Sequence, residues 1–130
     1  MNARHQGQRF RALPGRYAVC RLSPDSAVPA WAAGAFVNLT LTSDELAIIC
    51  PAGNVPADVR AERDWRVLKL VGPFPFTAVG VLASLATPLA RAGISLLSIA
   101  TYDTDYFLVK EEVFADAVSV LIAAGHTKIG

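Results

Sequence analysis

The hydrophobic pattern of this chain changes its period at Thr77, and this change restricts the possible folds more than any other feature. Before Thr77 the apolar residues alternate with polar ones over short runs, which is typical of β-strands. Over residues 77–92 they recur at helical spacing, with Thr77 as the expected N-cap and Gly93 as the expected residue beyond the helix. Pro88 lies inside this segment and predicts a kink or an interruption near residues 84–87.

The second half of the chain predicts the order strand, helix, strand, strand, helix, strand. Its last helix is amphipathic, and the acidic residues Glu111 and Glu112 at its start suit the positive end of the helix dipole. This βαββαβ order is the ferredoxin-like arrangement. The expected elements lie at residues 65–71, 77–92, 94–100, 106–109, 111–124 and 127–129.

The first half of the chain predicts the same order of elements with eroded helices. We therefore predict an α+β fold made of two ferredoxin-like βαββαβ units, the first with shortened helices. Residues 1–14 are expected to be a disordered leader, residues 15–64 the first unit and residues 65–130 the second. In the first unit, strands are expected at residues 16–22, 36–41 and 45–50, the last two as a hairpin, and short helical pieces at residues 29–33 and 55–58.

The composition indicates a protein that self-associates. Of the 130 residues, 53% are hydrophobic and 18% are charged, so some apolar surface is expected in a subunit interface, and we predict a homodimer. The formal net charge is +1, and the only basic cluster lies near the N-terminus, so no nucleic-acid partner is expected. The first 15 residues lack the apolar segment of a signal peptide. Since no apolar run reaches ~18 residues, we expect a cytoplasmic location and no contact with a membrane.

The sequence motifs predict neither an enzyme nor a metal or cofactor site. The sequence has no phosphate loop, no nucleophile elbow and no His/Cys set with metal-ligand spacing. Cys20 and Cys50 lie in apolar, strand-like runs and are expected to be small buried hydrophobic residues. Asp103 and Asp105 form a pair of carboxylates without the further oxygen ligands of a calcium loop. An enzyme with a reactive cysteine is therefore the least favoured function.

The second half of the chain also resembles a known family. It contains the run GPFPFTAVGVLASLATPLARAGISLLSIATYDTDYFLVKEE, which resembles the ACT domain of the CASTOR-like group. That group includes small bacterial tandem-ACT proteins and the cytosolic arginine sensors of animals. The resemblance extends over residues 65–129, and the earlier run AFVNLTLTSDELAIICP is similar to a first ACT unit. Similar regulatory units occur in aspartate kinases.

The resemblance implies an amino-acid site between the loop at residues 72–80 and the turn at residues 101–105. ACT units typically hold amino acids where the loop after the first strand meets the first helix, often against a neighbouring unit. Backbone N–H groups of residues 78–81 would then bind the α-carboxylate, and Asp105 would bind the α-ammonium group. The implied ligand-binding residues are Phe76, Thr77, Val79, Gly80, Val81, Thr101, Tyr102, Thr104 and Asp105.

The arginine sensors of this group carry a Thr-aromatic-x-x-Asp segment, which Thr101, Tyr102 and Asp105 match. Ala78 stands where those sensors have an acidic residue that helps to hold the guanidinium, so the resemblance does not extend to arginine as the ligand. In the ferredoxin-like order, the strands before the loop and before the turn are expected to run side by side. From the residues alone, the loop is also compatible with a stiff connection, and the carboxylates with ordinary turn residues.

These observations predict a non-catalytic sensor that binds an amino acid or a similar small ligand at an ACT-unit interface, without a cofactor. One alternative is a structural oligomerisation module that binds no ligand. Another is a regulatory relative of the ACT domains of aspartate kinases. Trp31 and Trp65 are expected to anchor the core or an interface rather than to stack on a ligand.

Overall fold

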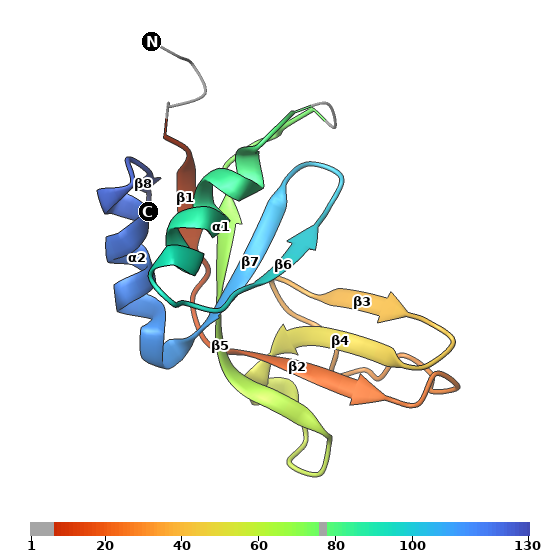
Figure 1. Ribbon diagram of the computed structural model, residues 1–130. Helices are drawn as coiled ribbons and strands as arrows, with labels where there is room; N and C mark the ends of the chain where they lie inside the picture. Colours follow the sequence, from red (N-terminus) through yellow and green to blue (C-terminus); the bar gives the residue numbers. More distant parts are fainter. Residues whose placement is uncertain (1–6, 76–77) are drawn as a thin grey trace. The chain divides into compact units, whose positions relative to one another are not determined.

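A computed structural model describes residues 7–75 and 78–130, and these residues form two compact units (Figure 1). The N-terminal unit comprises residues 15–65. The C-terminal unit comprises residues 66–130 together with the described residues that precede Gly15. One long strand, β5 (Ala61–Leu70), therefore contributes its first residues to the N-terminal unit and its last residues to the C-terminal unit.

The N-terminal unit is an antiparallel sheet in which β4 lies between β2 and β3. The expected hairpin is confirmed, because the two strands of β3–β4 pair from Asn38↔Ile49 to Leu41↔Leu46. The other edge of β2 pairs with the first residues of β5. The elements are β2 (Tyr17–Leu22), β3 (Asn38–Leu41), β4 (Leu46–Pro51) and the 3-10 turn η2 (Ala52–Asn54).

Alternation along β2 and β4 builds the core of this unit. Ala18 pairs with Cys50 and Cys20 with Ile48, so these small and branched apolar side chains point to one face of the sheet. Both cysteines are buried, as expected. Outside this cluster, the rings of Tyr17 and Phe36 meet edge to face. The buried cluster consists of Ala18, Cys20, Leu46, Ile48, Cys50 and Val55, with Trp31 packed against it.

The helical pieces of the N-terminal unit are shorter than predicted. Residues 29–33 contain only a turn at residues 30–31, because Pro29 and the left-handed Gly34 (φ 142°) enclose too few residues for a helix. The 3-10 turn at Ala52–Asn54 comes before the predicted position at residues 55–58, where Val55 is extended and buried. The helical segments of this unit are thus shorter than the sequence indicates.

The C-terminal unit has the predicted βαββαβ order, and with it the α+β, ferredoxin-like fold class is confirmed. The last strand of the N-terminal unit is also the first strand here. A single 3-10 turn, η3, leads into the second helix. The elements after β5 are α1 (Val81–Arg91), β6 (Leu97–Ala100), β7 (Asp105–Lys110), η3 (Glu111–Val113), α2 (Phe114–Ala123) and β8 (Thr127–Lys128).

The prediction of a disordered leader is wrong for residues 9–12, which form strand β1 (Arg9–Ala12). This strand pairs antiparallel with β5 and parallel with β8, so the strand order is β8–β1–β5–β7–β6. Its Phe10 is completely buried. A single apolar residue between two arginines gives a weak local signal, and the strand exists because partners far along the chain complete it. Residues 1–6 of the predicted leader lie outside the described residues.

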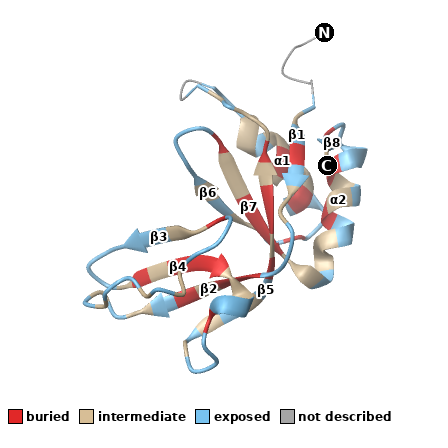
Figure 2. Ribbon diagram, turned by 180° about the vertical axis from the view of Figure 1, so that it is seen from behind, coloured by how far each residue is buried: buried red, intermediate tan, exposed pale blue. Residues whose placement is uncertain are grey.

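Both helices of the C-terminal unit contribute to one buried core with strands β1, β5 and β7. Figure 2 shows buried residues along β5 and β7. Because side chains alternate along a strand, Lys69 and its β1 neighbours Arg9 and Arg11 lie on the sheet face opposite this core. The buried core residues are Phe10, Leu68, Leu70, Leu85, Leu89, Ile94, Phe107, Val109, Ala117 and Leu121.

One expectation about neighbouring strands is wrong. The strands before the loop and before the turn, β5 and β6, were expected to lie side by side, but β7 lies between them and pairs with both. The hairpin of β6 and β7 places the turn at residues 101–104 at its tip. The loop and the turn still meet, through the hydrogen bonds described below.

Helix α1 begins at Val81 and runs through Pro88 to Arg91, so the predicted alternative of an interruption near residues 84–87 is wrong. Proline has no N–H, which deprives the carbonyl of Ser84 of its usual helical partner. The Nε2 atom of His126 lies 2.8 Å from this carbonyl oxygen, while the backbone N–H of Gln8 donates to Nδ1 at 2.9 Å. Since Nδ1 accepts, Nε2 carries the proton and donates to Ser84. A buried histidine thus replaces the hydrogen bond that Pro88 removes.

Replacing His126 with alanine is expected to destabilise the C-terminal unit by about 1–3 kcal/mol, because two backbone groups lose their partner. In a Pro88→Ala background the loss is expected to be smaller, since the new N–H at position 88 can bond to the carbonyl of Ser84. Urea denaturation of the four members of this double-mutant cycle measures the difference. Equal costs of His126→Ala in both backgrounds would contradict this account.

Candidate ligand-binding site

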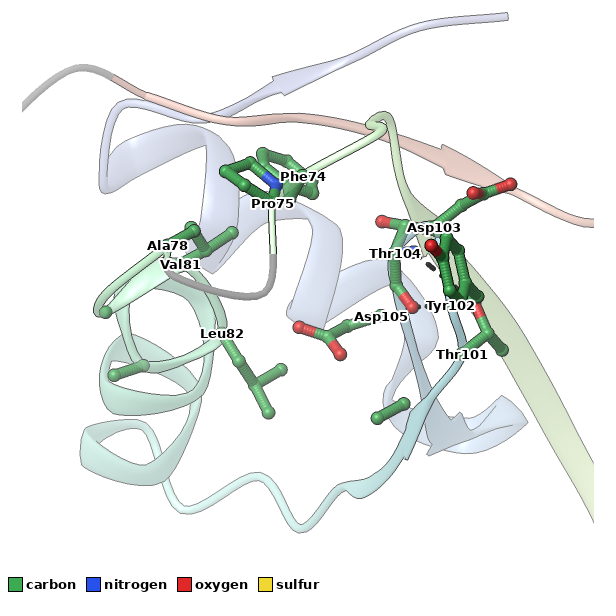
Figure 3. A pocket seen from close by; sticks show the side chains of 13 residues that line it. Phe74, Pro75, Ala78, Val81, Leu82, Thr101, Tyr102, Asp103, Thr104 and Asp105 are labelled. Carbon is green, nitrogen blue, oxygen red and sulfur yellow. Dashed lines mark hydrogen bonds between the residues drawn. The ribbon is translucent and has the colours of Figure 1, made fainter.

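A cavity of about 340 Å³ lies in the C-terminal unit, where the loop before α1 faces the turn between β6 and β7 (Figure 3). Its wall on one side is the first turn of α1, and on the other side the turn at residues 101–105. The lining residues are Phe74, Pro75, Ala78, Gly80, Val81, Leu82, Ala83, Ala100, Thr101, Tyr102, Asp103, Thr104 and Asp105.

Hydrogen bonds fix the turn against the end of β5. The hydroxyl of Thr104 donates to the carbonyl of Leu70 at 2.8 Å, and this threonine is buried. The N–H of Phe74 donates to the carbonyl of Asp103 at 2.9 Å. Within the turn, the Thr101 hydroxyl donates to the carbonyl of Thr104 at 2.8 Å. The loop and the turn are therefore held together before any ligand binds, which lowers the entropic cost of forming a site.

The start of α1 presents backbone donors to the cavity. Its N-cap is Gly80 rather than the predicted Thr77, which lies outside the described residues, and no side-chain hydrogen bond caps this end. Gly80 has a left-handed φ of 76°, a conformation in which glycine is favoured. The first N–H groups of a helix have no partner within the helix, so Val81, Leu82 and Ala83 carry the donors at this wall. The helix dipole adds a partial positive charge here.

Asp105 supplies a negative charge to the same cavity. It is the first residue of β7 and is partly buried. Figure 3 shows its carboxylate directed into the space between α1 and the turn, whereas the carboxylate of Asp103 points away from it. Among the described residues, the carboxylate of Asp105 makes no hydrogen bond or ion pair that would occupy it. The cavity therefore holds opposite charges on opposite walls.

The structure places six of the nine predicted site residues in this lining: Gly80, Val81, Thr101, Tyr102, Thr104 and Asp105. Val79 does not line the cavity, and its side chain is 93% exposed. Phe76 and Thr77 lie outside the described residues. A Cβ at Gly80 would meet only open space, so the left-handed φ, and not a lack of room, is what favours glycine there.

The sequence interpretation did not name several apolar lining residues, among them Phe74, Pro75, Leu82, Ala83 and Ala100. Leu82 and Ala83 follow the predicted Val81 by one and two positions and belong to the first turn of the helix. The observed helix start explains their position, because a helix that starts at Val81 places its first three N–H groups at residues 81–83. Because the sequence predicts a helix start at Thr77, the expected N–H donors lie at residues 78–81, earlier in the chain than the observed ones.

The two cysteines do not have the properties of a catalytic thiol. Burial, with the neighbouring Cys20 as a second cause, raises the pKa of Cys50 to about 11. Burial also raises the pKa of Cys20. A thiol with a raised pKa stays protonated near neutral pH and is a poor nucleophile. Within residues 7–75 and 78–130, no group of three or more His, Cys, Asp or Glu side chains could hold a metal ion.

None of the helices in the described part of the chain is long and apolar enough to cross a bilayer.

The C-terminal unit is thus a ferredoxin-like βαββαβ unit with a cavity at the start of its first helix, and comparison with known proteins identifies the family to which this unit belongs. The family model of the ACT domain matches residues 60–123, and a model of an N-terminal domain matches residues 15–58. Protein Atu0741 from Agobacterium tumefaciens is 37% identical in sequence to this chain. Its crystal structure matches with a TM-score of 0.89 over 95% of this chain and 92% of that chain. Residues 60–123 of the chain therefore belong to the ACT-domain family.

Two more distant similarities concern regulatory proteins. The human cytosolic arginine sensor for mTORC1 subunit 1 is 38% identical over 58 residues, which are 44% of this chain and 18% of the sensor. The match thus spans less than a fifth of that relative. The regulatory subunit of aspartate kinase from Thermus flavus has a TM-score of 0.62 at 11% identity, over 88% of this chain and 95% of that chain. At this identity the similarity shows the fold alone.

Proposed function

We propose that this chain is a non-catalytic regulatory module that binds an amino acid in the cavity at the start of α1. The observation that carries the proposal is the pairing of unlike charges across one cavity: backbone donors at the helix start and the Asp105 carboxylate opposite them. An α-amino acid carries a carboxylate and an ammonium group a few ångströms apart, so it presents the complementary pair. The similarity to a cytosolic arginine sensor supports amino-acid binding as the general role.

The α-carboxylate binds to the N–H groups of Val81, Leu82 and Ala83. Helix N-termini stabilise anions through these donors and through the dipole, and α1 has 11 residues to contribute to it. The open space beside Gly80 leaves the approach to the helix end unobstructed. The α-ammonium group binds to Asp105, and the hydroxyl of Thr101 lies in the same lining.

The side chain of the ligand is apolar in this proposal. Phe74, Pro75, Leu82 and Ala100 line the cavity and provide apolar contacts. Ala78 also lies in the lining and supplies no charge to hold a guanidinium. Burying an unpaired cation beside these groups would cost free energy, which disfavours arginine relative to an amino acid with a short apolar side chain.

A second copy of the chain closes the cavity in this proposal. Tyr102 lines the cavity and is 81% exposed, and Val79, which lies between the lining residues Ala78 and Gly80 in the sequence, is 93% exposed. Large apolar and aromatic side chains with this exposure are characteristic of interface anchors. The proposed site is therefore completed in a homodimer, in agreement with the high apolar fraction of the sequence.

A thermal-shift screen of the twenty amino acids tests the proposal. A ligand present at a hundredfold excess over its Kd is expected to stabilise the folded state by about 2.7 kcal/mol. For a chain of this size, this stabilisation raises the transition temperature by roughly 10 °C. We expect the largest shifts from amino acids with apolar side chains, and smaller ones from the matching amines and carboxylic acids, which lack one of the two charges. Equal shifts from an amino acid and its amine would contradict the proposed pairing of charges.

The second candidate function is an oligomerisation module that binds no ligand. The exposed Leu39 and Leu41 on β3, an edge strand of its sheet, favour it, since an apolar edge strand readily pairs with another chain. In this case no amino acid shifts the transition, and light scattering gives the same oligomer mass with and without each amino acid.

A further inference from the structure

A second cavity of about 240 Å³ lies on the other side of the turn at residues 101–105, also within the C-terminal unit. The two cavities share only Asp103 and Thr104. The chemistry of the second one is different, because two of its lining residues are cationic. The complete lining is Arg11, Lys69, Val71, Gly72, Pro73, Asp103 and Thr104.

The two cations are direct cross-strand neighbours. Arg11 on β1 pairs with Lys69 on β5 in an antiparallel ladder, so both side chains leave the sheet on the same face. Like charges in this position destabilise a sheet. Among the described residues neither side chain forms an ion pair, and the Nζ atom of Lys69 lies 5.9 Å from the centre of the Tyr106 ring. Within the described part of the chain, neither cation is thus neutralised by an ion pair, although the carboxylate of Asp103 lines the same cavity.

The other wall of this cavity is rigid. A Cβ on Gly72 would lie 3.1 Å from the carbonyl oxygen of Asp103, so a larger residue would push the loop and the turn apart by a few tenths of an ångström. The hydrogen bonds from Phe74 to Asp103 and from Thr104 to Leu70 hold the same two segments together. A concave site with a fixed wall and two adjacent cations is preorganised for a small anion.

We propose that this second cavity binds a small oxyanion through the guanidinium of Arg11 and the ammonium group of Lys69. Guanidinium and ammonium groups form charge-assisted hydrogen bonds with carboxylate and phosphate oxygens, and an anion between them removes their mutual repulsion. Asp103 in the same lining sets the selectivity. With two cations and one carboxylate in the lining, a monoanion neutralises the site, whereas a dianion leaves one excess negative charge in it, so the site prefers a carboxylate over inorganic phosphate.

This site depends on strand β1, which the chain inserts between β5 and β8. The inserted strand brings Arg11 opposite Lys69, and without it only one cation would line the cavity. The inference is independent of the amino-acid site, since none of the residues that bind the amino acid in that proposal contacts the oxyanion in this one.

Nuclear magnetic resonance titrations with sodium acetate, sodium phosphate and sodium chloride at matched ionic strength test the inference. We expect saturable shifts of the backbone amides of Lys69 and Gly72 with acetate, weaker binding of phosphate, and only small linear shifts with chloride. Lys69→Gln is expected to weaken acetate binding about tenfold, the size of one charge-assisted contact. Asp103→Asn is expected to strengthen the binding of both oxyanions, and of phosphate more than of acetate.

The variants also separate this site from the amino-acid site. Asp105→Asn should leave acetate binding at Lys69 and Gly72 unchanged, whatever it does to amino-acid binding. Lys69→Gln removes a like-charge contact and should therefore not reduce the stability of the fold, which urea denaturation checks. Linear shifts equal to those of chloride, or equal acetate affinity in Lys69→Gln and the parent protein, would overturn the inference.

Discussion

Replacing Phe10 with alanine is expected to destabilise the C-terminal unit by about 3–5 kcal/mol, the usual cost of removing a buried aromatic ring. The ring is completely buried and belongs to the same core as Leu68, Leu85 and Phe107. Alanine leaves a cavity among residues that are themselves held in strands and a helix, so they can collapse into it only in part. A residue near the start of the chain is thus expected to contribute as much to stability as other buried residues of the same core.

Two spectroscopic probes allow this loss to be assigned to one unit. Helices α1 and α2 belong to the C-terminal unit, so the helical circular dichroism signal follows its unfolding. Trp31 and Trp65 belong to the N-terminal unit, so tryptophan fluorescence follows that unit. In urea, Phe10→Ala should shift the circular dichroism transition to lower concentration.

Arg9→Ala is the matched control for Phe10→Ala. Arg9 is on the same strand with its side chain exposed, and its replacement should change stability by less than about 0.5 kcal/mol. If Phe10→Ala has no larger effect than this control, β1 does not contribute to the core in solution. A disordered leader would then be the correct description of these residues.

The sequence predicted those elements whose pattern is local and long. Helix α2 repeats apolar residues at helical spacing over ten residues and was expected within a few residues of its observed bounds. The β3–β4 hairpin carries a β-branched and aromatic pattern around a polar turn, and it was also expected correctly. In both cases neighbours along the chain supply the information that decides the structure.

The features that the sequence did not predict depend on distant partners. Strand β1 exists because β5 and β8 provide its hydrogen bonds, and no pattern within residues 9–12 encodes this. Helix α1 continues through Pro88 because His126, 38 positions later in the sequence, bonds to the carbonyl that proline leaves free. In the candidate site, the family resemblance predicts the turn residues but not the helix start at Val81. The left-handed conformation of Gly80 sets this start, and the sequence alone does not show that Gly80 adopts it.

Replacing Asp105 with asparagine is expected to weaken amino-acid binding ten- to a hundredfold. Asparagine keeps the shape of the side chain and removes its negative charge, so the α-ammonium group loses a charge-assisted contact worth about 1.5–3 kcal/mol. The fold should be unaffected, because the carboxylate makes no ion pair among the described residues. Calorimetry with an amino acid that binds the parent protein measures the change, and circular dichroism checks the fold.

Asp103→Asn is the matched control for Asp105→Asn, since it removes the same charge from the same turn. Figure 3 shows the Asp103 carboxylate pointing away from Asp105, so its loss should change amino-acid affinity by less than about threefold, as expected for a screened charge. Equal losses in the two variants would indicate that only the overall negative charge of the turn attracts the ligand. An unchanged affinity in Asp105→Asn would remove this residue from the site. We expect a loss confined to Asp105→Asn. The Asp105 carboxylate points into the cavity and can contact the α-ammonium group directly, whereas the Asp103 carboxylate points away from it.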